Sequence, residues 1–254
     1  MKQKTKHLPL ASAVIFALAT MAGGMVQAQE AAAAPEAKPD NEIVYNIAVT
    51  NDYRFRGYSQ TRARPALQGG ADWVHNPTGF YAGTWASTIK WVKDGGGDAS
   101  IEWDVYAGKR GNLTEAVSYD IGGLGYIYPS NDLNPSANTF ELYGQLGFGP
   151  LSLKYSHSLT NLFGFADSKN SQYWDAQLNR EVADGYIFNF HVGHQKVRNL
   201  SAASYTDWKI GVTKDFGIAT VALAYIDTST SFYVAPTGKN LGKSGLILTV
   251  SKTF

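Results

Sequence analysis

The stretch that decides the fold is the last one, GLILTVSKTF at residues 245–254. One side of this extended stretch carries Leu246, Leu248, Val250 and Phe254, and the other side carries Ile247, Thr249 and Ser251. Lys252 interrupts the apolar side near its end, where a long lysine side chain can reach a polar surface. A period of two predicts a β-strand with one apolar face and one more polar face.

The same period runs through most of the chain before this stretch. The first segment begins at Ile43, with Tyr45, Ile47, Val49, Tyr53 and Phe55 on one face and Asn46, Thr50, Asp52, Arg54 and Arg56 on the other. Similar segments lie at residues 66–74, 80–89, 100–108, 116–128, 139–147, 151–159, 172–179, 186–195, 205–214, 218–226 and 244–254. The sequence therefore predicts an all-β protein of about twelve strands.

The connections between these segments alternate between short and long. The short ones contain turn residues and lie at residues 75–79, 109–115, 148–150, 180–185 and 215–217. The long ones lie at residues 57–64, 90–99, 129–138, 160–171, 196–204 and 227–243. This alternation predicts antiparallel, up-and-down strands with the short turns on one rim of a barrel and the long loops on the other.

The composition excludes several other classes. At 44% hydrophobic and 13% aromatic residues the chain is too apolar to be disordered. It contains no cysteine, which rules out a disulfide scaffold, a thiolate metal site and a cysteine nucleophile. After the first 28 residues no stretch approaches the ~20 consecutive apolar residues of a membrane-spanning helix.

The N-terminus has the layout of a secretory signal. Lys2, Lys4 and Lys6 precede an apolar run and then small residues up to Ala28, so we expect residues 1–28 to be a signal peptide cleaved near Ala28. Residues 29–42 have no apolar period and are expected to form a flexible periplasmic tail before a barrel at 43–254. Without the leader the chain is close to neutral, so we expect no nucleic-acid partner.

Alternation alone does not separate a membrane barrel from a soluble one, which would turn its apolar face inward. The export signal favours the membrane barrel, and so do aromatic residues near segment ends, which would form interfacial girdles. They are Tyr45, Phe55, Phe80, Tyr126, Tyr128, Phe140, Phe148, Tyr173, Trp174, Tyr186, Phe216 and Tyr225. The terminal Phe254 resembles the signal that delivers bacterial outer-membrane barrels to their assembly machinery. We therefore predict a Gram-negative outer-membrane barrel with both termini in the periplasm, in contact with membrane lipid and lipopolysaccharide.

Four motifs resemble a known family. They are DYRFRGYSQT at residues 52–61, PALQGG at 65–70, GFYAGTWAS at 79–87 and EWDVYAG at 102–108. They are similar to the TorF-like family of outer-membrane porins of Gram-negative bacteria, and the resemblance extends from about residue 44 to residue 254. The resemblance implies an outer-membrane channel.

The more polar faces of the segments provide a lining for the lumen. The predicted pore-lining residues are Arg54, Arg56, Asp72, Glu102, Asp104, Glu141, Lys154, Asp175 and Lys209. Such groups must pair with one another or contact water. They could therefore line a water-filled channel for the passive diffusion of small polar solutes, or they could interlock into a non-conducting structural or adhesive barrel.

An enzyme that modifies lipids is the remaining alternative. His157 alternates with leucines and is expected to face lipid, and His191 and His194 are three residues apart, which places them on opposite faces of a strand. Two histidines in that arrangement do not form a simple metal clamp. We therefore expect no enzyme activity, no metal site and no cofactor, and a monomeric barrel acting as a channel.

Overall fold

The computed structural model describes residues 39–254. The predicted signal peptide and residues 29–38 of the predicted tail lie outside the described residues. β1 begins at Asn41, slightly before the expected start of the barrel at residue 43. No helix in the described part of the chain is long and apolar enough to cross a bilayer.

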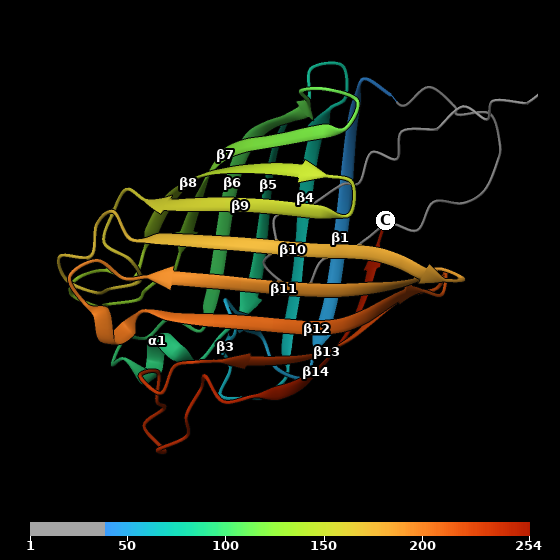
Figure 1. The fold of residues 1–254 in the computed structure, drawn as a ribbon. Coiled ribbons are helices and arrows are strands. Elements are labelled where there is room, and N and C mark those ends of the chain that lie inside the picture. The colour runs from blue at the N-terminus through green and yellow to red at the C-terminus, as the bar shows by residue number, and fades with distance from the viewer. Residues whose placement is uncertain (1–38) are drawn as a thin grey trace, which may run out of the picture.

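Twelve antiparallel strands of the described chain form one closed barrel (Figure 1). Around the barrel each strand pairs with its neighbours in the chain, and the last strand pairs with the first. The strands are β1 (Asn41–Thr50), β4 (Ala66–His75), β5 (Phe80–Thr88), β6 (Ile101–Asn112), β7 (Val117–Ile127), β8 (Thr139–Phe148), β9 (Leu151–Ser158), β10 (Gln172–Ala183), β11 (Tyr186–Lys196), β12 (Tyr205–Asp215), β13 (Thr220–Thr228) and β14 (Gly245–Thr253). The predicted strand number and topology are confirmed.

The barrel closes where β1 pairs with β14. The register runs from Asn46 opposite Thr253 to Thr50 opposite Thr249. Beyond the ladder, Tyr45 and Phe254 exchange backbone hydrogen bonds of 3.1 and 2.9 Å. Because β1 also pairs with β4, the barrel strands leave no open sheet edge.

The apolar face of the strands points outward. In β14, Leu248 is 45% exposed, whereas Ile247 and Ser251 on the other face are 8% and 6% exposed. The other barrel strands also carry large apolar side chains on their outer surface, including Ile47, Leu153, Ile210 and Leu223. A barrel with an apolar exterior and a more polar interior is a transmembrane barrel, and the soluble alternative is excluded.

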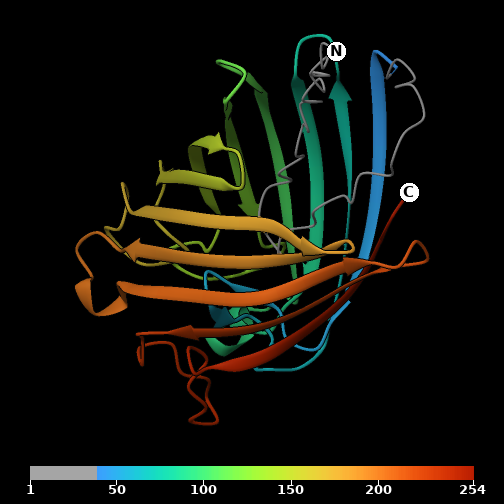
Figure 2. The ribbon, with the colours of Figure 1, turned by 45° about the vertical axis from the view of Figure 1, so that its right-hand side comes forward.

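The first predicted strand is too long. β1 ends at Thr50, and residues 52–61 fold back into the barrel as a small hairpin of β2 (Arg54–Phe55) and β3 (Tyr58–Ser59). The backbone reverses at Arg56 and Gly57, which both have positive φ, at 44° and 87°. Residues 52–61 are called the inserted hairpin below. Figures 1 and 2 both show it within the outline of the barrel, beside the short helix α1 (Trp91–Asp94).

Several aromatic residues predicted for the girdles lie inside instead. Phe55 belongs to the inserted hairpin, and Tyr126, Tyr128 and Tyr173 face the interior, each at most 7% exposed. The alternation of the strand explains the position of Tyr126, which shares its face of β7 with the buried Leu124. The Phe55 ring packs against the Tyr126 ring, with centroids 5.6 Å apart. The remaining predicted girdle residues are on the outer surface or the rims: Tyr45, Phe80, Phe140, Phe148, Trp174, Tyr186, Phe216 and Tyr225.

The outward apolar face can be tested at Leu248, which lies in the middle of β14 opposite Leu223. The substitution Leu248→Arg is expected to lower the free energy of unfolding in lipid vesicles by about 2–4 kcal/mol, because it places a charge among acyl chains. The control is Ile218→Arg near a rim, where Ile218 is 84% exposed and the loss should be about 0–1 kcal/mol. Unfolding in urea followed by tryptophan fluorescence measures both, and equal losses would contradict the membrane-facing band.

Candidate functional site

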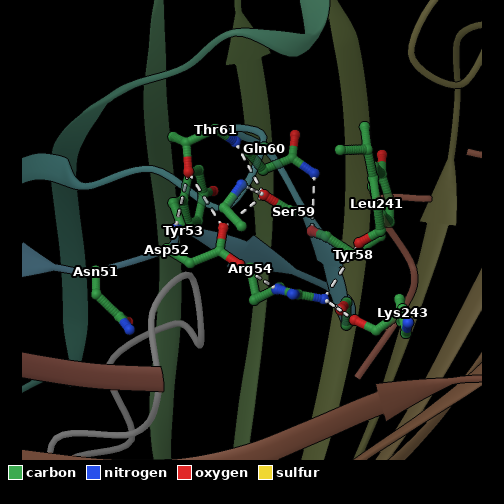
Figure 3. A network of polar contacts seen from close by, with 12 residues as sticks. Asn51, Asp52, Tyr53, Arg54, Tyr58, Ser59, Gln60, Thr61, Leu241 and Lys243 are labelled. Carbon is green, nitrogen blue, oxygen red and sulfur yellow. Dashed lines mark hydrogen bonds and ion pairs between the residues drawn. The ribbon is translucent and has the colours of Figure 1, made fainter. Parts of the chain in front are cut away.

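The inserted hairpin is organised by one buried carboxylate. Asp52 accepts hydrogen bonds from the Ser59 hydroxyl at 2.5 Å, the Thr61 hydroxyl at 3.2 Å and the Arg54 Nε at 2.6 Å (Figure 3). The backbone also closes the hairpin, because the amide of Gln60 donates to the carbonyl of Tyr53 at 2.8 Å. Asp52 thereby joins three side chains of the hairpin and fixes its shape.

Arg54 joins the inserted hairpin to the last long loop. Its Nη1 donates to the carbonyls of Gly57, Leu241 and Lys243 at 3.1, 3.2 and 2.9 Å (Figure 3). With Asp52 on its Nε, the guanidinium is held by four protein groups. Arg54 is therefore a structural residue of the hairpin as much as a lining residue.

Arg56 reaches from the inserted hairpin to the barrel wall. It donates to both carboxylate oxygens of Glu141 at 3.1 and 2.6 Å and to Gln195 Oε1 at 2.7 Å. Its guanidinium also lies over the Tyr173 ring, 4.3 Å from the centroid. Both members of the Arg56–Glu141 pair are buried, with side-chain exposures of 6% and 3%. This bidentate pair is the main charged contact between the hairpin and the wall.

Glu102 on β6 gives a second contact between the hairpin and the wall. It accepts hydrogen bonds from the hydroxyls of Tyr53 at 2.7 Å and Tyr128 at 3.0 Å. Burial and the Glu102 carboxylate raise the pKa of Tyr53, and burial raises the pKa of Tyr58 to about 12. Both phenols of the hairpin therefore stay protonated at neutral pH.

Asp104, two residues from Glu102 on the same face of β6, has no such donors. It is fully buried, and neither of its carboxylate oxygens has a hydrogen-bond partner among the described residues. A buried and unsatisfied carboxylate is costly, so Asp104 opposes the packed arrangement around it.

Aromatic side chains from the hairpin, the long loops and the wall strands β7, β8 and β12 fill the part of the interior next to the loops. Tyr58 stacks on Tyr233 with ring centroids 4.2 Å apart, and Phe55 packs edge-on against Phe163 at 5.4 Å. The buried aromatic residues of this cluster are Tyr53, Phe55, Tyr58, Tyr126, Tyr128, Tyr143, Phe163 and Tyr205. In this conformation the loop half of the barrel is thus occupied by side chains.

A cavity of about 120 Å³ lies against the hairpin and the inner wall. Five of the nine predicted pore-lining residues line it: Arg54, Arg56, Lys154, Asp175 and Lys209. The other four also lie inside the barrel but away from the cavity. Glu102 and Glu141 bind the hairpin, Asp104 is unpartnered, and Asp72 accepts a hydrogen bond from Tyr106 at 2.7 Å. Whether any of the nine residues lines a conducting pore stays a prediction.

Three acidic or histidine residues outside the predicted set also line the cavity: Asp52 of the hairpin, and His191 and Asp207 of the wall. His191 Nδ1 lies 2.7 Å from Asp175 and its Nε2 lies 2.7 Å from Asp207. The alternation of the strand is enough to find Asp207, which lies two residues from the predicted Lys209 and shares its inward face of β12. The spacing of His191 and His194 predicts opposite faces of β11, which the structure confirms, but it does not indicate the two carboxylates beside His191.

His157 is not part of the inner wall. His157 faces outward on β9 and contacts the Tyr155 hydroxyl at 2.9 Å and Asn170 at 3.1 Å. Within residues 39–254 no group of three or more histidine, aspartate or glutamate side chains has the geometry to hold a metal ion.

The comparisons with known proteins agree with a porin-like barrel. A family model described as "Bacterial protein of unknown function (Gcw_chp)" matches residues 33–254. It does not address the TorF-like resemblance, which stays a prediction. No curated protein sequence matches the chain at a significant level.

Two solved porins have a similar fold. The KdgM porin, solved in complex with disordered oligogalacturonate, is 9% identical with a TM-score of 0.53, over 84% of this chain and 97% of that chain. The NanC porin is 11% identical with a TM-score of 0.55, over 82% of this chain and 98% of that chain. Similarity at this level of identity concerns the fold alone.

The Arg56–Glu141 pair can be tested by removing one partner. Arg56→Ala is expected to lower the free energy of unfolding by about 3–5 kcal/mol, because it leaves Glu141 buried without its cation. The double variant Arg56→Met with Glu141→Leu should lose less, since no charge remains unpaired. Chemical unfolding in lipid vesicles measures both. Lys93→Ala is the control, because Lys93 pairs with Asp98 at an exposed site; a loss as small as the control's for Arg56→Ala would show that the buried pair is unimportant.

Asp104 and Glu102 give a matched pair of substitutions on one face of β6. Asp104→Leu removes a buried carboxyl group without hydrogen-bond partners and is expected to raise the free energy of unfolding by about 1–3 kcal/mol. Glu102→Leu leaves the hydroxyls of Tyr53 and Tyr128 without an acceptor and should lower it. The temperature at which the folded band is lost in gel electrophoresis ranks the three proteins, and a lower temperature for Asp104→Leu than for the parent protein would refute the assignment.

Proposed function

We propose that this chain, which belongs to the Gcw_chp family of bacterial proteins of unknown function, is an outer-membrane channel through which small polar solutes diffuse passively. The observation that carries the proposal is the combination of an apolar exterior with a charged inner wall that encloses a cavity. A barrel that served only as a scaffold has no need of eight acidic, basic or histidine side chains beside one cavity, since charges there are costly to keep.

The inserted hairpin restricts the passage. Its backbone hydrogen bonds to other segments go to loop residues, from Ser59 to Leu241 at 2.9 Å and from Lys90 to Gln60 at 2.8 Å. No backbone hydrogen bond among the described residues joins it to the barrel ladder. The hairpin is thus held to the wall by side chains, and moving it leaves the wall intact. We propose that solutes pass when it is displaced.

The second candidate is a non-conducting structural or adhesive barrel. It is favoured by the filled loop half of the interior, in which the hairpin and loop aromatics pack into one cluster. The two candidates differ in one respect, because only the channel requires that the hairpin can leave its place.

The proposals for export, membrane insertion and lipid contact rest on the amino-acid sequence. We propose export by the N-terminal signal, insertion through the assembly machinery that reads Phe254, and contact with outer-membrane lipid and lipopolysaccharide. We propose no catalytic role and no cofactor.

Replacing the whole first loop tests the channel. Thr50 and Ala66 are directly opposite each other in the ladder, so residues 51–65 can be replaced by a two-residue Asn-Gly turn without disturbing β1 or β4. In planar-bilayer recordings the shortened protein is expected to give discrete current steps several times larger than those of the parent protein, because the hairpin no longer fills the lumen.

The control for this experiment shortens an exposed part of another loop. Residues 236–239 are all exposed and lie outside the aromatic cluster, so replacing them by two glycines should leave the current unchanged. Silence of the shortened first-loop protein, once it is shown to be folded, would overturn the channel and support the structural barrel.

A further inference from the structure

Charged side chains of alternating sign line the inner wall where β9, β10, β11 and β12 lie side by side. Lys154 is opposite Asp175 in the ladder, and His191 is opposite Lys209. In the register, Gly193 lies between Asp175 and Asp207. Because Gly193 has no side chain, the ring of His191 at the next inward position of β11 reaches the space between the two carboxylates. The order along the wall is Lys154, Asp175, His191, Asp207, Lys209.

The His191 ring is a cation in this arrangement. Each of its two nitrogens lies 2.7 Å from a carboxylate oxygen, one of Asp175 and one of Asp207. A neutral imidazole has one N–H and would point a lone pair at the second carboxylate, so both nitrogens must carry a proton.

Both carboxylates are satisfied without the lysines. Asp175 accepts a further hydrogen bond from Gln177 at 2.8 Å, and Asp207 accepts one from the Tyr173 hydroxyl at 2.9 Å. The two acids are thereby held against the wall by His191, Gln177 and Tyr173, which leaves them poorly placed to bind a cation in the cavity.

The two lysines are left with unused donors. Neither Lys154 nor Lys209 has a hydrogen bond or an ion pair with any described residue, although both line the cavity. Lys154 Nζ lies over the Tyr143 ring, 4.1 Å from its centroid. A lysine ammonium has three N–H donors, so the cavity holds up to six without a protein acceptor.

The charge of the cavity is positive on this wall. Among the residues that line the cavity, Lys154, His191 and Lys209 outweigh Asp175 and Asp207. The two hairpin arginines are neutralised elsewhere, because Arg54 pairs with Asp52 and Arg56 pairs with Glu141. Asp120 near Lys154 lies outside the cavity and accepts a hydrogen bond from Tyr81. Excess cations with unused donors beside a small cavity are suited to an anion.

From this geometry we propose that the cavity is a binding site for a small organic carboxylate, which Lys154 and Lys209 hold through their ammonium groups. The inference rests on the proposed function, since it names the class of solute that would pause on its way through the channel. A cavity of about 120 Å³ is a little smaller than the ~150 Å³ that admits benzene, which limits the ligand to about six non-hydrogen atoms. The carboxylate would supply the acceptors that the two lysines lack.

Calorimetric titration of the detergent-solubilised, folded protein with sodium lactate tests the site. We expect one binding site per barrel, and at least a tenfold loss of affinity in the double variant Lys154→Met with Lys209→Met. Lactamide has the same size and no charge, and it should not bind. Lactate that does not bind, or that binds equally to parent and double variant, would overturn the proposal; so would inorganic phosphate that binds as tightly as lactate, because it would remove the preference for a carboxylate.

The matched control is Lys214→Met, on the same strand as Lys209. Lys214 faces outward, and its Nζ donates to the carbonyl of Asp184 at 2.8 Å, so its loss should leave lactate binding unchanged. An equal loss in this control would also overturn the proposal. If the double variant does not fold, Lys209→Met alone takes its place with the same expected direction.

The titration separates this inference from the channel. Calorimetry in detergent detects binding whether or not the barrel conducts. Bilayer recording detects conduction whether or not lactate binds. Lactate binding with a silent, folded loop-shortened barrel would leave the site standing and remove the channel. Current without lactate binding would remove the site and leave the channel.

Discussion

The lack of hydrogen-bonding partners in lipid is the constraint on which the rest of the structure depends. Every backbone N–H and C=O that crosses the bilayer has to find its partner inside the protein, and a sheet does this only when its first and last strands meet. The pairing of β1 with β14, extended by the exchange between Tyr45 and Phe254, fulfils that condition. Once the sheet is closed, one face of every strand points to lipid. The other face, with its charges, must then be accommodated inside the barrel.

A closed interior with many ionisable groups needs partners for them, and the inserted hairpin provides several. It brings Arg56 to Glu141 and the Tyr53 hydroxyl to Glu102, which satisfies two wall carboxylates at once. On the wall formed by β10, β11 and β12, the absence of a side chain at Gly193 lets His191 contact both Asp175 and Asp207. The interior is thus organised by local pairing, and Asp104 and the two cavity lysines are among the groups that have no hydrogen-bonded partner.

The strands were predictable from the sequence because lipid and lumen impose opposite preferences on alternate residues. The same signal misled at residues 52–56, where the alternation continues although the chain has already left the wall. β1 ends at Thr50, and the hairpin that follows turns at Arg56 and Gly57. The left-handed conformation of an arginine is not visible in a pattern of polarity. The lining residues on the wall strands followed from parity, and parity would also have found Asp207. The pairing of His191 with two carboxylates depends on a register across three strands, which no single segment specifies.

The inward fold of residues 52–61 also decides what this end of the barrel presents to large molecules. An antibody, a phage fibre or a protease approaching the loop rim finds the hairpin's arginines, with side-chain exposures of 6% and 7%, out of reach. It meets instead the exposed residues 236–239 of the last long loop. Immune recognition and proteolytic cutting should therefore fall on exposed loop residues such as these, and the segment that fills the lumen is shielded from both.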